Sequence, residues 1–257
     1  MLLLLPPSET KRDGGAGEVL DLAALSFTEL GDLRAELVEE VVELAGDPAE
    51  MMRALKLGPR QAAEVARNAA LRHSPTTPAI DRYTGVLFDA LDAPSLDAPA
   101  RAFAGETVVV HSALFGLVGA LDPIPAYRLS HDSRLPGGAL KRRWRDALSR
   151  TLAAYDGVVV DLRSEGYVEL GPAPRRAGSA FVRVVSEDGT GRRRALNHFN
   201  KRAKGLFTRA VLEQRPEIES IRDLIDWAAS AGFSLDAGAG SDASGAESPD
   251  RELQLIA

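Results

Sequence analysis

Three cations fall within one short stretch of the sequence, because Lys201, Arg202 and Lys204 all lie inside the segment His198–Leu206. As a helix this stretch would hold them on about one and a half turns, with Lys201 and Lys204 on the same face. Charges of one sign at this spacing repel each other, so they require an anion nearby. That anion is a phosphate backbone, a nucleotide or a set of carboxylates elsewhere in the fold. The spacing favours a ligand-binding role over a merely solvated face.

Polar residues also follow two apolar runs that read as buried strands. Lys11 comes after Leu2–Leu5 on a loop that holds Gly14 and Gly15, a usual position for a group presented to a ligand. Ser164 and Glu165 follow Val158–Val160, at the end of a strand where α/β sheets often place their sites. The alternative for Lys11 is a solvated surface lysine without a ligand. Glu165 is either a catalytic base or an ion-pair partner. Candidate catalytic residues are therefore Lys11, Ser164, Glu165 and Lys204.

Tyr127 and Arg128 place a stacking ring beside a planar guanidinium that suits phosphate or carboxylate. The alternative is a structural arginine that pairs with Asp122 or Asp161. We expect six side chains to converge in one concavity, because each flanks a predicted strand or opens a helix. These six residues are Lys11, Tyr127, Arg128, Ser164, Lys201 and Lys204. Further candidates for binding DNA or an anion are Tyr167, Arg202, Arg209, Lys56 and Gly58.

Charge is divided along the chain, although the whole protein is acidic with a net charge of −6. Residues 1–100 carry 9 basic and 17 acidic side chains, residues 101–215 carry 20 and 11, and residues 216–257 carry 2 and 9. The basic middle section either forms a face for polyanions or neutralises the acidic segments within the fold. The sequence has no cysteine, which excludes a disulfide scaffold and a thiolate site. The four histidines show no metal-ligand spacing, so we predict neither a metal nor a cofactor.

The elements that would position these residues mix helices with irregularly spaced strands. This order predicts a single α+β domain with a mixed β-sheet surrounded by helices. The run Leu2–Leu5 is too short for a signal peptide, and no segment approaches the roughly 20 apolar residues of a membrane span. We predict helices at Thr28–Leu44, Asp47–Leu55, Arg60–Arg72, Gly85–Leu91, Gly138–Tyr155, Asn200–Gln214 and Ile218–Ala229, and strands at Leu2–Leu5, Thr107–Val110, Val158–Val160, Phe181–Val185 and Arg192–Leu196.

Residues 47–73 resemble a helix-hairpin-helix element, in which hairpin amides hold a phosphate without reading sequence. Gly58 stands at the hairpin, but Lys56 replaces the usual first glycine. A plain helical hairpin that packs into the core is the alternative. The domain is expected to span residues 1–236. Residues 237–250 are rich in Gly, Ala, Ser and Asp, so we predict that 237–257 is a disordered acidic tail, with Leu253, Leu255 and Ile256 either docking as a last strand or staying free.

Six segments, taken in order, resemble the YaaA family of bacterial peroxide stress-resistance proteins over nearly the whole chain to about Phe233. The chain departs from the family at Gly119-Ala120, where members place an arginine and a proline. One cation expected in a basic cleft is therefore absent. The six segments are Leu4–Lys11, Arg82–Leu87, Ser112–Gly116, Asp122–Leu129, Asp161–Tyr167 and His198–Gly205.

The resemblance implies a cytoplasmic protein linked to hydrogen peroxide resistance and to lower free intracellular iron. It also implies a fold peculiar to the family, with a basic cleft and a helix-hairpin-helix element that bind double-stranded or branched DNA. We therefore expect a monomeric DNA-binding protein of the oxidative stress response that makes sequence-independent phosphate contacts and no membrane contact. The alternative is an enzyme acting on a nucleotide, a nucleic acid or a small anionic substrate in a pocket lined by Lys, Arg and Tyr. Sequestration of iron or a metabolite is a third possibility.

Overall fold

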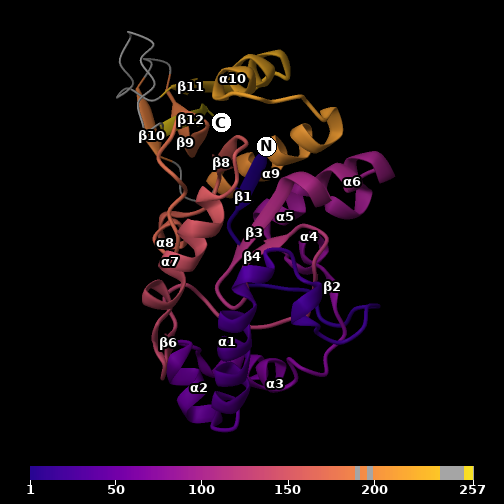
Figure 1. Ribbon diagram of the computed structural model, residues 1–257, viewed down its shortest axis with the longest axis vertical. Helices are drawn as coiled ribbons and strands as arrows, with labels where there is room; N and C mark the ends of the chain where they lie inside the picture. The colour runs from indigo at the N-terminus through magenta and orange to yellow at the C-terminus, as the bar shows by residue number, and fades with distance from the viewer. Residues whose placement is uncertain (189–191, 196–198, 238–251, 257) are drawn as a thin grey trace.

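A mixed β-sheet of eight strands runs through the middle of the computed structural model, which describes residues 1–188, 192–195, 199–237 and 252–256 (Figure 1). The strand order is β11-β12-β9-β8-β1-β3-β4, with β10 paired to β9. The strands β12, β9, β8, β1 and β3 run parallel to their neighbours in this series, and β4, β10 and β11 are antiparallel to theirs. The strands are β1 (Leu2–Leu5), β3 (Val108–Ser112), β4 (Gly116–Gly119), β8 (Val159–Asp161), β9 (Ser179–Glu187), β10 (Arg193–Ala195), β11 (Ser234–Ala237) and β12 (Glu252–Ile256).

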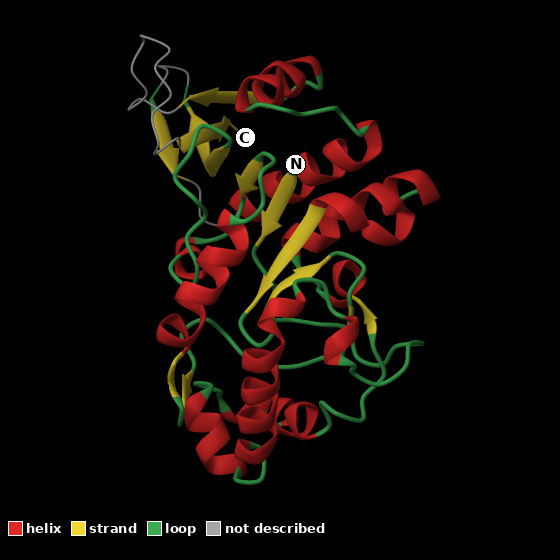
Figure 2. Ribbon diagram, viewed as in Figure 1, coloured by secondary structure: helices red, strands yellow, loops and turns green. Residues whose placement is uncertain are grey.

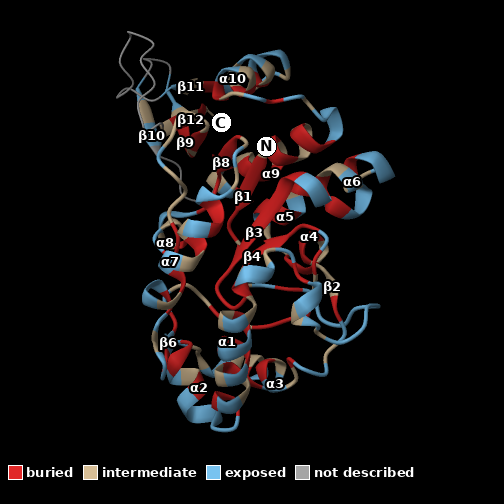
Figure 3. Cartoon of the chain, in the orientation of Figure 1, coloured by how far each residue is buried: buried red, intermediate tan, exposed pale blue. Residues whose placement is uncertain are grey.

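The central position of β1 explains its sequence. All four residues of Leu2–Leu5 are buried, and the strand pairs with β3 on one side and with β8 on the other. A parallel strand covered on both faces needs apolar side chains on both, so it reads as an unbroken apolar run. The predicted first strand is therefore confirmed, and Figure 3 shows it buried at the centre of the molecule.

Helices surround this sheet (Figure 2), and two strand pairs lie apart from it. Helix α9 packs against α5, and Gly205 permits the contact, because a Cβ there would lie 2.2 Å from the carbonyl oxygen of Leu87. The helices are α1 (Gly31–Leu44), α2 (Pro48–Ala54), α3 (Ala63–Ala69), α4 (Ala79–Arg82), α5 (Val86–Leu91), α6 (Ala98–Thr107), α7 (Leu140–Ala153), α8 (Glu165–Val168), α9 (Phe199–Gln214) and α10 (Ile221–Ser230), and the small pairs are β2 (Thr77–Pro78) with β5 (Pro123–Ile124) and β6 (Arg134–Leu135) with β7 (Gly138–Ala139).

The prediction of a single α+β domain with a mixed sheet is confirmed. The helix-hairpin-helix element is not. Two short helices, α2 and α3, do occupy the segment, and the Asp47 side chain accepts from the backbone N–H of Glu50, as its position before Pro48 predicts. However, the N–H of Gly58 donates to Oε1 of Gln61 at 3.0 Å, so this amide is already satisfied within the chain.

The C-terminal boundary at residue 236 is wrong for the last strand. Residues 252–256 form β12, which lies between β11 and β9, with Leu253 and Leu255 fully buried. The alternating apolar residues Leu253 and Leu255 suit a strand with one buried face. Residues 238–251, the larger part of the predicted tail, lie outside the described residues.

Further elements differ from the sequence-based prediction, and α6 and β4 are two of them. Thr107 ends helix α6 instead of opening a strand, and α6 itself was not predicted in its proline-rich surroundings. Strand β4 was also missed, because Gly116–Gly119 is short and glycine-bounded, yet it pairs with β3. Among the described residues, no helix is long and apolar enough to cross a membrane.

Candidate functional site

Three adjacent strands bring polar side chains to one edge of the sheet. The strands β8, β1 and β3 are parallel, so their carboxyl ends meet at the same edge. After β1 the chain continues to β3, and after β8 it continues to β9. These two connections run in opposite directions along the strand order. Such a divergence opens a crevice where α/β proteins commonly bind ligands. Lys11 follows β1, Ser112 ends β3, and Asp161 ends β8.

Lys11 is buried at this edge, with only 7% of its surface exposed. Its Nζ donates to the carbonyl oxygen of Ser8 at 2.9 Å and lies 4.1 Å from the ring centroid of Tyr127 and 5.2 Å from that of Tyr83. Burial lowers the pKa of Lys11 from 10.5 to about 7, against the opposing charge of Glu9. A substantial fraction of this amine is therefore neutral at physiological pH.

The loop that carries Lys11 is fixed to a distant segment. Lys11 forms an isolated antiparallel bridge with Tyr83, the residue that follows α4. The N–H of Arg12 donates to the carbonyl of Arg82 at 2.9 Å, and the N–H of Thr84 donates to the carbonyl of Thr10 at 3.2 Å. These bonds hold the amine and the Tyr83 ring in one arrangement.

A row of hydroxyl groups lies beneath the amine. The Ser112 hydroxyl lies 2.7 Å from the Tyr127 hydroxyl, which lies 2.8 Å from the Tyr83 hydroxyl. All three residues are buried. Burial raises the pKa of Tyr127 and of Tyr83, so both phenols stay protonated at neutral pH.

Arg128 lies at the margin of the Lys11 site and is half-buried. Its Nη1 donates to the carbonyl of Glu9 at 3.2 Å, and its Nη2 lies 3.4 Å from Oε2 of Glu9. Asn68 holds the Arg128 backbone through both its N–H and its carbonyl, each at 2.8 Å. The structural partner of Arg128 is thus Glu9, and neither of the two aspartates proposed from the sequence forms an ion pair with it in the described residues.

A second polar cluster follows β8. Arg163 is completely buried. It donates from Nε to Oδ1 of Asp161 at 2.8 Å and from Nη2 to Oδ2 of Asp161 at 2.6 Å. Its Nη1 reaches Nδ1 of His111 at 2.9 Å and the carbonyl of Gly171 at 3.0 Å. Lys204 of α9 is also buried, and its Nζ lies 3.4 Å from the carbonyl of Arg163. Burial lowers the pKa of Lys204 to about 8, against the opposing charge of Asp161.

Tyr167 of α8 lies between the two clusters. Its ring centroid is 5.4 Å from that of His111 and 5.1 Å from that of His131. The close approach of His131 explains Gly166, since a Cβ at that position would lie 2.3 Å from Nε2 of His131. The Tyr167 hydroxyl is buried without a hydrogen-bond partner among the described residues, and burial raises the pKa of this phenol.

The other predicted site residues do not join this buried arrangement. Ser164, Lys201 and Arg202 are exposed, and no hydrogen bond or ion pair joins the Lys11 amine to Ser164, Lys201 or Lys204 within the described part of the chain. Glu165 is exposed and pairs with Arg183 at 3.1 Å, which favours the ion-pair interpretation.

Three basic or hairpin residues have structural partners instead. Arg209 donates to the carbonyls of Leu91 and Asp92 at 3.0 and 3.1 Å, so it caps the end of α5. Lys56 pairs with Asp132, and the Gly58 amide is satisfied as described above. Gly119, the position of the missing family arginine, pairs with Val109 near the start of β3 and not with its carboxyl end.

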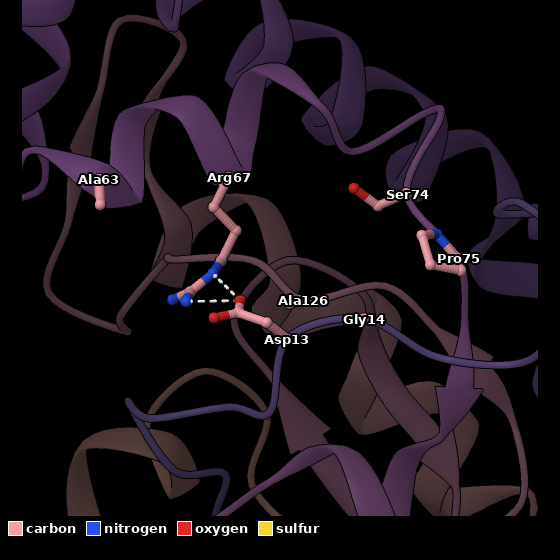
Figure 4. A pocket seen from close by; sticks show the side chains of 7 residues that line it. All are labelled: Asp13, Gly14, Ala63, Arg67, Ser74, Pro75 and Ala126. Carbon is pink, nitrogen blue, oxygen red and sulfur yellow. Dashed lines mark hydrogen bonds and ion pairs between the residues drawn. The ribbon is translucent and has the colours of Figure 1, made fainter.

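Two small cavities adjoin the loop that follows Lys11. One, of about 260 Å³, contains the ion pair in which Arg67 donates to Oδ1 of Asp13 at 2.7 Å (Figure 4). The other, of about 240 Å³, is lined in part by Tyr83, Arg12 and Asp89. Asp13 lines one of these cavities and Arg12 the other, so both lie next to the residues that directly follow Lys11.

Sequence reasoning missed four residues of this arrangement: Tyr83, Ser112, His111 and Arg163. Each belongs to or adjoins a segment that carries the family resemblance, yet each also reads as an ordinary core or strand residue. The available signal was position, since three of the four stand at or just beyond the carboxyl end of a strand. In the described residues no group of three or more His, Asp or Glu side chains is arranged to hold a metal ion.

Comparison with known proteins agrees with the resemblance seen in the sequence. A UPF0246 protein of Corynebacterium efficiens is 41% identical over 241 residues, which cover 92% of this chain and 95% of that protein. A UPF0246 protein of Streptomyces coelicolor is 39% identical over 243 residues, 92% of each chain. An uncharacterised protein of Campylobacter jejuni is 25% identical over 210 residues, 80% of this chain and 82% of that protein. The model of the family described as peroxide stress protein YaaA matches residues 1–239, and the chain belongs to that family.

Proposed function

We propose that this peroxide stress protein is an enzyme that acts on a carbonyl group of a nucleotide, a nucleic acid or another anionic substrate, with Lys11 as its nucleophile. The burial of the Lys11 amine against two tyrosine rings is the observation that carries this proposal. A lysine that binds a phosphate backbone in an open groove works as an exposed, permanent cation. Lys11 is enclosed, and its lowered pKa supplies the neutral amine that attack on carbon requires.

The surroundings of Lys11 suit addition to a carbonyl. When the amine is neutral, it donates one hydrogen to the Ser8 carbonyl and keeps its lone pair for the substrate. The lone pair forms an N–C bond, the π pair of the carbonyl moves to oxygen, and that oxygen takes up a proton while the nitrogen releases one. The proton that the nitrogen released goes to the resulting hydroxyl, which leaves as water while the nitrogen lone pair forms the C=N bond of an iminium ion bound to Lys11.

Trapping with borohydride tests this function. Hydride reduces an iminium to a stable secondary amine, so a mass shift on Lys11 reports the intermediate. The probes are pyridoxal 5′-phosphate and a duplex oligonucleotide that carries an aldehyde. We expect a trapped adduct at Lys11 with at least one of them and none after Lys11→Met. Lys201→Met is the matched control, because that lysine is exposed. Equal amounts of trapped adduct in Lys11→Met and in the parent protein would refute the proposal.

Binding of duplex DNA is a second candidate function, and the exposure of Lys201 and Arg202 at the start of α9 favours it. Neither side chain forms an ion pair with another described residue, so both cations are available to phosphates. Such contacts would give affinity without sequence preference. The affinity would fall steeply as the salt concentration rises, because the counterions that binding releases then gain less entropy. Under this proposal the protein acts in the cytoplasm as a monomer, and it limits DNA damage and free iron during peroxide stress.

Titration of a fluorescent duplex from low to physiological salt tests the second function. We expect the dissociation constant to rise linearly with salt on logarithmic axes. A flat dependence, or no binding at low salt, would exclude it. The enzymatic function and the DNA-binding function are compatible, because the exposed cations and the enclosed amine are different residues.

A further inference from the structure

The hydrogen bonds in the hydroxyl row below Lys11 all point in one direction, from donor to acceptor. The contacts of Ser112 determine that direction. Ser112 Oγ accepts from the N–H of Leu114 at 3.1 Å and from the N–H of Phe115 at 2.9 Å. A hydroxyl oxygen has two lone pairs, and these backbone donors occupy both. The remaining contact of Ser112, to the Tyr127 hydroxyl at 2.7 Å, must therefore use the hydrogen of Ser112.

The donor role of Ser112 also determines the donor and acceptor roles of the next two hydroxyls. Because Ser112 donates to Tyr127, the Tyr127 hydrogen is free to be given to Tyr83 at 2.8 Å. Tyr83 then accepts, and among the described residues its own hydrogen is left with Ser112 Oγ, whose two lone pairs already receive backbone N–H groups. A buried hydroxyl normally uses its hydrogen, so an unused donor here calls for a ligand or a water. Alignment of several hydroxyls also makes the last one a stronger donor than an isolated phenol.

Tyr83 and the Lys11 amine are neighbours. Lys11 Nζ is 5.2 Å from the Tyr83 ring centroid, and the two backbones form the bridge described above. Stacking on Phe88, with ring centroids 5.1 Å apart, fixes the Tyr83 ring from its other side. Tyr83 also lines the cavity of about 240 Å³, together with Arg12 of the loop that follows Lys11.

We propose that Tyr83 is the catalytic acid of this site, and that it donates its hydroxyl hydrogen to the oxygen of the carbonyl that Lys11 attacks. This inference rests on the proposed function and adds to it the proton source. The proton lost by Tyr83 is replaced by the one that the nitrogen releases as the carbinolamine forms. Tyr127 and Ser112 are positioning residues, since they act on the substrate only through Tyr83.

The test compares rates of imine formation with pyridoxal 5′-phosphate. Tyr83→Phe keeps the ring stacking and removes only the hydroxyl. We expect the rate to fall about 100-fold, as for the loss of a general acid, while the rate still rises with pH around 7 as Lys11 loses its proton. Tyr127→Phe should reduce the rate by less, because Tyr83 then keeps its proton but loses its orientation. Tyr155→Phe, at the end of α7 and away from the site, should match the parent protein.

The outcomes separate the two proposals. If the parent protein forms no imine with either aldehyde probe, the proposed function fails. If the parent protein forms the imine and Tyr83→Phe forms it at the same rate, the role of Tyr83 alone fails. A larger loss in Tyr127→Phe than in Tyr83→Phe would reverse the assigned direction and overturn the inference. Should Tyr83→Phe unfold, a fluorinated tyrosine at position 83 keeps the ring and hydroxyl but lowers the phenol pKa. The rate should then decline at lower pH than in the parent protein, and an unchanged pH profile would refute the role.

Discussion

The amine of Lys11 lies 4.1 Å from the ring centroid of Tyr127, and both residues are buried. Two opposing effects meet in this contact. The electron-rich face of the ring stabilises the charged amine, whereas burial destabilises it. Burial is the larger effect, since the pKa of Lys11 falls to about 7. The contact therefore creates a lysine whose charge changes near neutral pH.

The stability of the protein should depend on this charge. The pKa of Lys11 is lowered by burial from 10.5 to about 7, so between these values the unfolded chain binds more protons than the folded one. The free energy of unfolding should therefore rise with pH in that window, by at most about 1.4 kcal/mol for each pH unit from this group. Lys11→Met should remove this rise. Urea unfolding at several pH values between 7 and 10 measures it, with Lys201→Met as the control that keeps the parental slope. Equal slopes in Lys11→Met and the parent protein would contradict the prediction.

The two lysines of the basic helix should behave differently. The sequence alone treats Lys201 and Lys204 as one pair whose joint removal costs little stability, but Lys204 is buried and Lys201 is exposed. Lys201→Ala should change the free energy of unfolding by no more than about 0.5 kcal/mol. Lys204→Ala leaves a gap beneath α9 and should cost roughly 2 kcal/mol. Thermal unfolding of the two single variants decides the matter, and equal melting temperatures would show that the Lys204 side chain packs less closely than its burial indicates.

Removing the exposed cations of α9 should weaken any binding of DNA. Lys201→Ala with Arg202→Ala removes two phosphate contacts, which should lower the slope of log affinity against log salt by about 2. The matched control is Lys141→Ala with Arg142→Ala, which removes two cations from the start of α7. Fluorescence titration at several salt concentrations gives both slopes. Equal losses in the two double variants would mean that general charge, and not this helix, accounts for the affinity.

The last strand should be required for stability. Leu253 is completely buried in β12, so Leu253→Ala should destabilise the protein by roughly 3 kcal/mol. Gln254 is only partly buried and accepts from Arg193, and Gln254→Ala should cost about 1 kcal/mol or less. Urea denaturation compares the two. If Leu253→Ala unfolds at the parental midpoint, β12 is not part of the cooperative unit.

The sequence predicted the elements whose signal is local. The apolar run Leu2–Leu5 and the cap Asp47 with Pro48 each specify their structure through neighbouring residues. The partners of β12 could not be predicted, because they depend on pairing with strands far away in the sequence. For the same reason Leu253 and Leu255 could be either a strand or a free end.

The candidate site likewise combines residues that the sequence predicts with residues that only the fold reveals. Of the six residues predicted to converge, Lys11, Tyr127 and Arg128 lie within one arrangement. Ser164 and Lys201 are exposed instead, and Lys204 lies in the second cluster, after β8. Tyr83 and Ser112 could not be separated from core residues, since only the fold reveals which hydroxyls face one another. Arg209, a candidate for binding an anion, donates to carbonyls at the end of α5, and no spacing in the sequence indicates these partners.

The order of strands has a consequence for synthesis on the ribosome. Strand β11 precedes β12 in the chain, yet β12 separates it from β9. A nascent chain that has emerged only as far as residue 237 thus presents β11 with no neighbour to pair with and leaves one edge of β9 open. Unpaired strand edges are where growing chains associate wrongly. Until β12 emerges, two strand edges of the growing chain therefore stay open to association with other chains.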